Sequence, residues 1–338
     1  MLLNQSDSTL SVFKRVWWSL VASISILVLV SSVAGCTQKP EPDLRISSLL
    51  WPGYEPLVLA HQLGYFEGQN VHVLDYLSNT DAMSAFENHN LEAGAFTLDE
   101  ALHMLADGAD LKIVLIMDSS LGGDVIMANP GIDSVRELKG KAIAVESSAV
   151  GAYVLKRALQ LNQMTMSDVD VIPTNAIEQV HKFQSGEVEA AVSFNPYQFQ
   201  LSELGKKVIF DSSQIPNEIL DVLVVRNDII EQQPEKVRLI VKNWFRAVEY
   251  QAEHPHQAAT HAAERYKMSP QEYIGSLSGL QFVDVATNKR LLNPDNSPLL
   301  NLAPQMLENL QALGLVKEGD DYGDRLLKTA LTTEFLPK

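Results

Sequence analysis

The sequence predicts an α/β protein of two lobes, each an open, mostly parallel sheet flanked by helices, with a helical C-terminal region. Three observations predict this class. Short apolar runs alternate with helical patterns over residues 44–117, the alternation restarts after residues 119–123, and helical patterns dominate from residue 234 onward. Such alternation is typical of parallel strands whose connecting helices cover the sheet.

In the first lobe, four short strands are expected with helices between them. The strands are expected at 44–50, 70–77, 93–97 and 111–117, and the helices at 56–65, 80–88 and 98–107. The last run is continuously apolar, which is typical of a strand buried on both faces of a parallel sheet. The sequence Trp51-Pro52-Gly53 ends the first strand, because proline and glycine interrupt regular structure.

In the second lobe, the same pattern repeats. Strands are expected at 124–128, 141–145, 169–172, 188–194 and 208–210, and helices at 134–138, 149–161, 177–185 and 196–204. An apolar strand at 221–226 is then expected to return to the first lobe. Helices are expected to follow at 234–253, 256–267, 269–278 and 299–313.

The connection between the lobes predicts their boundaries. The alternative arrangement is two tandem domains joined by a single linker, but the sequence contains no Pro/Ser/Gly-rich segment that would separate them. We therefore expect the chain to cross between lobes twice, near 118–124 and 211–222. Lobe 1 would then consist of 44–118 and 222–338 with the C-terminal helices, and lobe 2 of 119–221.

The N-terminus indicates export. Lys14 and Arg15 precede an apolar run at 16–30, and small residues follow up to Cys36. These are the features of a signal peptide, and the run is shorter than the ~20 residues of a spanning helix. The ending Val33-Ala34-Gly35-Cys36 resembles the lipobox of bacterial lipoproteins. The resemblance implies a signal peptide at 1–35, acylation of Cys36, and a polar tether at 36–43. A plain secretory signal or a membrane anchor is the alternative.

Composition excludes several classes of protein. Cys36 is the only cysteine, so no disulfide and no cysteine-based zinc site are expected. The net charge of −16 excludes nucleic acid as a partner held by bulk charge. His254, His256 and His261 cluster in the sequence but lie at a predicted helix junction, so no metal is expected. No cofactor and no catalytic residue are expected either, since no Gly-x-Ser-x-Gly sequence is present.

Four segments carry a family resemblance. They are 63–66 (LGYF), 94–97 (GAFT), 133–141 (DSVRELKGK) and 183–190 (FQSGEVEA). In this order and spacing they resemble the periplasmic binding proteins of the nitrate, sulfonate and taurine group, the SsuA/THI5-like family, which also contains thiamine-pyrimidine binders. The resemblance spans about residues 44–250. It implies the two-lobe fold of type 2 periplasmic binding proteins and a monomer that delivers its ligand to an ABC permease.

The implied ligand site is the cleft between the lobes, at the carboxyl ends of the strands and the first turns of helices. The candidate ligand-binding residues are Trp51, Tyr54, Glu55, Asn79, Asp81, Thr97, Ser119, Asp124, Ser147, Ser148, Tyr153, Asn195 and Asp221. Each acid among them has an alternative role as a helix cap or first-turn residue.

The loops expected to line the cleft combine acids with aromatic residues and contain no lysine, arginine or histidine. Carboxylates accept N–H groups, and aromatic faces attract cations. The sequence therefore predicts a neutral or cationic nitrogen compound, such as a pyrimidine or an amine. Three alternatives stay open: binding of nitrate, sulfonate or taurine, ligand sensing for a membrane signalling protein, and an enzyme of thiamine-pyrimidine synthesis. The last uses a cysteine-rich motif that this chain lacks.

Overall fold

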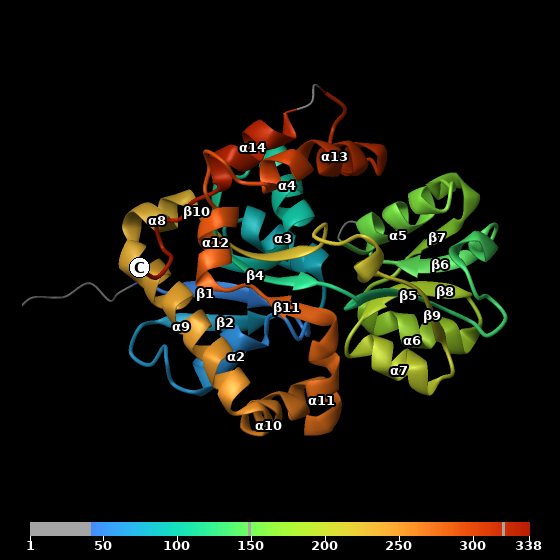
Figure 1. Ribbon diagram of the computed structural model, residues 1–338, viewed down its shortest axis with the longest axis horizontal. Coiled ribbons are helices and arrows are strands. Elements are labelled where there is room, and N and C mark those ends of the chain that lie inside the picture. The colour runs from blue at the N-terminus through green and yellow to red at the C-terminus, as the bar shows by residue number, and fades with distance from the viewer. Residues whose placement is uncertain (1–41, 148–149, 320–321) are drawn as a thin grey trace, which may run out of the picture. The chain divides into compact units, whose positions relative to one another are not determined.

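The first sheet has six strands in the order β11-β4-β10-β3-β1-β2 (Figure 1). The computed structural model describes residues 42–147, 150–319 and 322–338, so Cys36 and Ser148 lie outside the described residues. The strands are β1 (Leu44–Ser48), β2 (Val71–Asp75), β3 (Ala93–Thr97), β4 (Leu111–Ser120), β10 (Leu220–Arg226) and β11 (Leu280–Phe282). β1, β2 and β3 pair in parallel, whereas β10 runs antiparallel between β3 and β4.

The second sheet has five strands in the order β7-β6-β8-β5-β9. They are β5 (Asp124–Ala128), β6 (Ala142–Val145), β7 (Asp170–Pro173), β8 (Ala190–Phe194) and β9 (Lys207–Asp211). β5 is antiparallel to both of its neighbours, and the other pairs are parallel. Both sheets are therefore mixed. In the first sheet, β10 and β11 run opposite to β1, β2, β3 and β4. In the second sheet, β5 runs opposite to β6, β7, β8 and β9. The expected fold class is confirmed.

The chain passes from the first sheet to the second and returns. β4 reaches Ser120 before β5 begins, and β10 starts at Leu220 after β9 ends. Ser119 pairs with Leu220 in the first sheet, so pairing there extends two residues beyond the predicted lobe boundary at each crossing. Gly123, between β4 and β5, has room for hydrogen only, because an added Cβ would lie 2.6 Å from the Trp51 ring.

Helices cover both sheets. Those of the first half are α2 (Glu55–Gln62), α3 (Asn79–Glu87), α4 (Leu98–Ala106), α5 (Val150–Leu161), α6 (Ala176–Ser185) and α7 (Tyr197–Glu203). α5, α6 and α7 pack on the second sheet (Figure 1). The side chains of Ser78 and Asn175 accept from the backbone at the starts of α3 and α6, as expected for helix caps.

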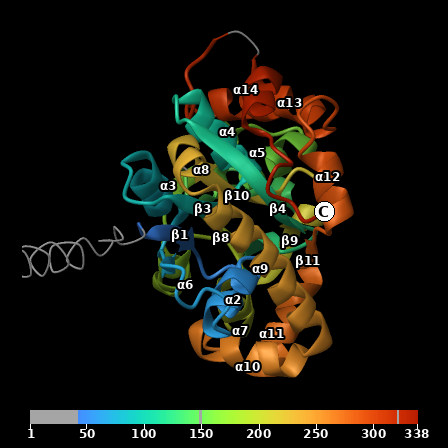
Figure 2. The ribbon, with the colours of Figure 1, turned by 90° about the vertical axis from the view of Figure 1, so that its left-hand side faces the viewer.

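The C-terminal region is helical with one exception. Its helices are α8 (Asn227–Gln232), α9 (Pro234–Glu253), α10 (Pro255–Tyr266), α11 (Pro270–Ser276), α12 (Val285–Leu291), α13 (Leu299–Ala312) and α14 (Gly323–Ala330). α9 packs along α2, and α10 contacts α2, α9 and α11 (Figure 2). No helix in the described part of the chain is both long and apolar enough to cross a membrane.

The exception is the short strand β11, and the expectation of a helical C-terminal region is confirmed. Its three residues pair with Asp118, Ser119 and Ser120 at the end of β4. The strand is held by the backbone, because Leu121 N donates to Gly279 O at 2.8 Å. Trp244 of α9 is fully buried and lies 6.2 Å from the ring of Phe282, so α9 supports the outer side of β11.

After β11 in the chain, a side chain of α12 bonds to the edge of β4. Asn288 of α12 is fully buried, and its amide accepts from Ile116 N at 2.7 Å and donates to Ile116 O at 2.9 Å. The amide thus replaces the peptide group of a neighbouring strand, which satisfies a buried backbone pair. β4 is therefore bonded along both edges up to the point where it leaves the first sheet.

Candidate functional site

The loop after β1 brings three predicted site residues together. Trp51 Nε1 donates to Asp221 Oδ2 at 3.0 Å, and the Tyr54 hydroxyl donates to Asp221 Oδ1 at 2.5 Å. All three side chains are buried. The chain turns tightly here, since Tyr54 N donates to Trp51 O at 2.9 Å. Gly53 is required for the approach, because an added Cβ would lie 2.2 Å from Asp118 Oδ2.

Asp118 joins this group from β4. Strand register places Asp221 opposite Asp118 on one side and opposite Thr97 on the other. Neither carboxylate oxygen of Asp118 accepts from an N–H group or a hydroxyl of the described residues. Burial raises the pKa of Asp118 to about 7. Burial, and next the charge of Asp118, raise the pKa of Asp221 well above its usual range.

Three further buried acids surround the pair. Glu100 accepts from Thr97 N at 3.0 Å and from Val150 N at 3.3 Å, so its carboxylate joins the first turns of α4 and α5. Burial raises the pKa of Glu100 to about 8 and, likewise, the pKa of Asp99 and of Asp124 to about 6. Asp124 begins β5, so the group includes a residue of the second sheet.

The structure contains a cavity of about 230 Å³ whose lining includes none of the buried acids of this group. It is lined by Leu49, Leu50, Asp75, Tyr76 and Leu77 after β1 and β2, by Phe194 and Tyr197 after β8, and by Arg265 of α10. Phe194 contacts Trp51 edge-on with ring centroids 5.7 Å apart. The cavity therefore lies between the carboxyl ends of strands from both sheets, where the cleft is expected.

Arg265 corrects the expectation that basic side chains are absent from the cleft. The cleft loops contain none, but this guanidinium reaches the cleft from α10. It forms ion pairs with Glu55 and Asp75. Burial raises the pKa of Glu55 to about 7, while the charge of Arg265 opposes this rise. The Glu55 carboxylate is therefore engaged by a cation of the protein itself.

A polar contact joins the two sheets at the cleft edge. Glu146, after β6, accepts from Thr80 N at 3.1 Å and from Thr80 Oγ1 at 2.9 Å, at the first turn of α3. Asn79, a predicted site residue, is buried next to this contact, and its amide oxygen has no hydrogen-bond partner among the described residues. The contact places an acid of the second sheet at a helix N-terminus, where negative charge is favoured.

The other predicted site residues have different environments. Asp81 is exposed in the first turn of α3, which agrees with its alternative role. Tyr153 is fully buried and donates to Glu218 at 2.9 Å. Ser119 lines a 600 Å³ cavity beside β11, and Asn195 lines one of about 330 Å³ near α11. Ser147 is half-buried, with its hydroxyl 3.4 Å from Val145 O.

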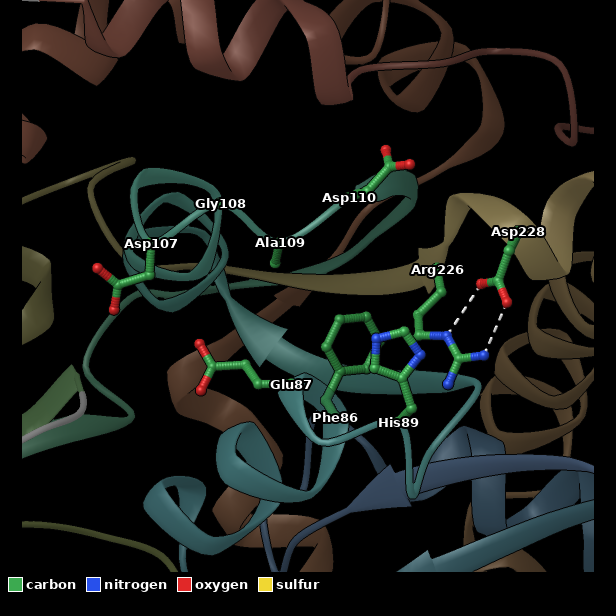
Figure 3. A pocket seen from close by; sticks show the side chains of 9 residues that line it. All are labelled: Phe86, Glu87, His89, Asp107, Gly108, Ala109, Asp110, Arg226 and Asp228. Atoms are coloured by element: carbon green, nitrogen blue, oxygen red, sulfur yellow. Dashed lines mark hydrogen bonds and ion pairs between the residues drawn. The ribbon is translucent and has the colours of Figure 1, made fainter.

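A further cavity, of about 580 Å³, lies at the opposite end of the first sheet (Figure 3). Its lining includes Asp110, directly before β4, and Arg226, the last residue of β10. Arg226 is paired with Asp228 at 2.9 Å. Because β4 begins here and ends at Ser120, this cavity is separate from the cleft. No group of three or more His, Cys, Asp or Glu side chains that could hold a metal occurs in the described ranges.

Sequence reasoning missed two residues of the site. Asp118 is not among the candidate residues, and the strand before it is expected to end at residue 117, but β4 extends through it, and its register with Asp221 makes it central. Arg265 had no local signal, because it lies 210 residues from Glu55 in the sequence.

Comparisons with known proteins agree with this geometry. Residues 51–258 match the family model described as NMT1/THI5 like. The chain is 25% identical over 252 residues to the "Putative aliphatic sulfonates-binding protein" of Bacillus subtilis (strain 168), which covers 70% of this chain and 75% of that protein. The alkanesulfonate-binding protein SsuA from Xanthomonas axonopodis pv. citri, bound to MOPS, superimposes with a TM-score of 0.68 at 17% identity, covering 82% of this chain and 96% of the other.

A second solved structure has the same architecture. The periplasmic nitrate-binding protein NrtA from Synechocystis PCC 6803 matches with a TM-score of 0.71 at 12% identity, covering 87% of this chain and 86% of the other. The fold and the cleft thus define a solute-binding protein of the periplasmic class, the kind that works with ABC permeases. Within this class, the chain belongs to the NMT1/THI5-like family.

Proposed function

We propose that this protein is the lipid-anchored solute-binding component of an ABC importer and that its ligand is a small neutral or cationic nitrogen compound. The observation that carries the ligand class is the buried acidic group formed by Asp99, Asp118, Asp124 and Asp221. All four side chains are buried, and no basic side chain contributes to the raised pKa values of these acids. Buried charges are normally paired, so a ligand with N–H donors would supply what the group lacks.

The aromatic residues support the same class. Trp51 and Phe194 meet edge-on, and Phe194 meets Tyr197 in the same way with centroids 5.6 Å apart. Trp51 follows β1 of the first sheet, whereas Phe194 ends β8 and Tyr197 begins α7, and these last two rings border the 230 Å³ cavity. Aromatic faces beside carboxylates suit a planar or cationic nitrogen compound. Lobe 1 (44–118 and 222–338) and lobe 2 (119–221) would close on it without a covalent step.

A sulfonate or nitrate is the second candidate. Two observations favour it: the names of the relatives above, and the presence of Arg265 in the lining of the cavity. Arg265 already serves two carboxylates, however, so its charge is largely compensated. A protein that reports occupancy to a membrane sensor would need the same cleft, and the permease or the sensor is the partner in either case.

The ligand class predicts a definite pattern of stabilisation. Pyrimidines and small amines should raise the melting temperature of the purified protein, because a ligand that binds only the folded state stabilises it. Taurine and nitrate should leave the melting temperature unchanged. Differential scanning fluorimetry followed by calorimetry would measure this. Binding of taurine or nitrate, with every nitrogen compound silent, would contradict the proposed ligand class and favour the second candidate.

The anchor carries a separate prediction. Replacing Cys36 by serine should leave the precursor uncleaved by the lipoprotein signal peptidase and unlabelled by radioactive palmitate, because the thiol is the proposed acyl acceptor. Labelling in the producing bacterium and the size of the chain on a gel would report both effects. Serine differs from cysteine by one atom, so export itself should continue. Equal palmitate labelling of the variant and the wild type would rule out acylation at this position.

A further inference from the structure

Asp118 and Asp221 form a buried pair of carboxyl groups on the strands that enter and leave the second sheet. Register places them directly opposite each other, and neither side chain is more than 2% exposed. Directly opposed residues of antiparallel strands have Cβ atoms about 4.5–5.5 Å apart. Two carboxylates this close and away from water cannot both ionise without a compensating charge.

The titratable and charged groups around the pair provide no such charge. They are Tyr54 from the loop after β1, Asp124 from β5, and Asp99 and Glu100 from α4. All of these are acids or a phenol. Arg265, which lines the 230 Å³ cavity, is paired with Glu55 and Asp75 instead. In the described part of the chain, no basic side chain bonds to either carboxyl of the pair.

The pair also includes carboxyl oxygens that accept no hydrogen bond from a donor group of the described residues. Asp221 accepts from Trp51 and Tyr54, whereas neither oxygen of Asp118 accepts from an N–H group or a hydroxyl of the described residues. Thr97, opposite Asp221 on β3, is 4% exposed. Buried polar atoms without partners are rare in folded proteins and call for an explanation such as an absent ligand. Asp118 and Thr97 flank Asp221 in one row across three strands.

We infer that Asp118 and Asp221 share one proton in the free protein, and that the ligand is an organic cation whose N–H groups take the place of this proton. The inference rests on the proposed function and narrows it from neutral or cationic compounds to ammonium and amidinium compounds. On binding, the O–H bond of the acid breaks and its proton passes to solvent. The pair then carries two negative charges, the ligand brings one positive charge, and its N–H groups donate to the carboxylates.

The shared proton is tested without any ligand by Asp118→Asn. A carboxyl group whose pKa is raised on folding stabilises the folded state below the unfolded pKa, and this stability is lost as the pH rises through the folded pKa. The wild type should therefore lose stability between about pH 5 and pH 8 more steeply than the variant. Urea unfolding across this range measures both. The stability of the variant relative to the wild type should grow with pH, and a pH-independent difference would overturn the shared proton.

The replacement by N–H groups is tested with four matched aromatic probes. Benzamidinium has a planar cation with N–H donors, phenyltrimethylammonium has the charge without N–H groups, benzamide is neutral, and benzenesulfonate is an anion. Calorimetry in two buffers of different ionisation enthalpy counts the protons released. We expect benzamidinium to bind best and to release about one proton per ligand from the wild type, with affinity rising about tenfold per pH unit below the pKa of the pair.

Each outcome of the probe experiment is decisive. In Asp118→Asn, benzamidinium should bind at least about tenfold more weakly and release no proton, because only one carboxylate remains. Binding of benzamidinium without proton release would overturn the exchange but leave the proposed function standing. Equal binding of phenyltrimethylammonium would overturn the role of the N–H groups. Binding of benzenesulfonate alone, or of none of the four, would overturn the organic-cation class.

Discussion

Replacing Arg265 by alanine is expected to lower the free energy of unfolding by about 3–5 kcal/mol near neutral pH. Glu55 is 2% exposed, and Arg265 is its cationic partner, so the variant leaves a buried carboxylate uncompensated. Asp75, the second partner of Arg265, is more than half exposed and tolerates the loss. The measurement is urea unfolding of the purified protein with and without the substitution.

The loss of stability caused by the Arg265 substitution should increase with pH. Without the guanidinium, the pKa of Glu55 should rise above the value of about 7 that it has in the wild type. The folded variant then gains stability from protonated Glu55, and this contribution is lost as the pH rises. The deficit should therefore be larger at about pH 8 than at about pH 5. Adding Glu55→Gln should restore most of the stability, because a neutral amide removes the buried charge. An equal deficit at both pH values would contradict the assignment.

Replacing Trp244 by alanine is expected to cost about 3–5 kcal/mol, because a fully buried indole leaves a large cavity. The consequence should extend to β11, since Trp244 packs against Phe282, and Phe282 pairs with Asp118. Hydrogen exchange should accelerate in residues 280–282 more than in the second sheet. Both effects are measurable, by urea unfolding and by hydrogen exchange with mass spectrometry.

Trp244→Phe is the matched control. The indole N–H of Trp244 has no hydrogen-bond partner among the described residues, so phenylalanine removes an unsatisfied donor while keeping most of the apolar surface. It should recover more than half of the loss caused by alanine. A variant with alanine that unfolds at the same urea concentration as the wild type would show that α9 does not support the sheet.

Periodicity was sufficient to predict most of the fold. The alternation of apolar runs and helical patterns locates β1 to β10 and α9, because these segments have a strong period and clear breakers. β11 could not be predicted, since its three residues are too short to show any period. Its existence depends on the position of Gly279 beside Leu121, which is a tertiary contact. The role of Asn288 could not be predicted either, because nothing in the neighbouring sequence distinguishes an amide that bonds to a strand edge from an amide at the surface.

The site was predicted in part. The rule that ligands meet the carboxyl ends of strands selected Trp51, Tyr54 and Asp221, which the structure brings together. The same rule selected Asp81 and Tyr153, which lie in the first turns of α3 and α5, and their predicted roles stay predictions. Arg265 was missed because its helix is distant in sequence, and whether a helix reaches the cleft is decided by packing. Ser148 and Cys36 lie outside the described residues, so their predicted roles stay predictions.

The two sheets differ in how much of the chain must be synthesised before each can be completed. The five strands of the second sheet come from one stretch, Asp124 to Asp211, whereas the first sheet needs β10 and, near the C-terminus, β11. A chain that emerges N-terminus first can complete the second sheet while the first still lacks two strands. Until β10 arrives, β3 and β4 have open edges facing one another. The acid-bearing strand pair is therefore assembled late, and a truncated chain that ends before residue 220 would retain the second sheet and lack this pair.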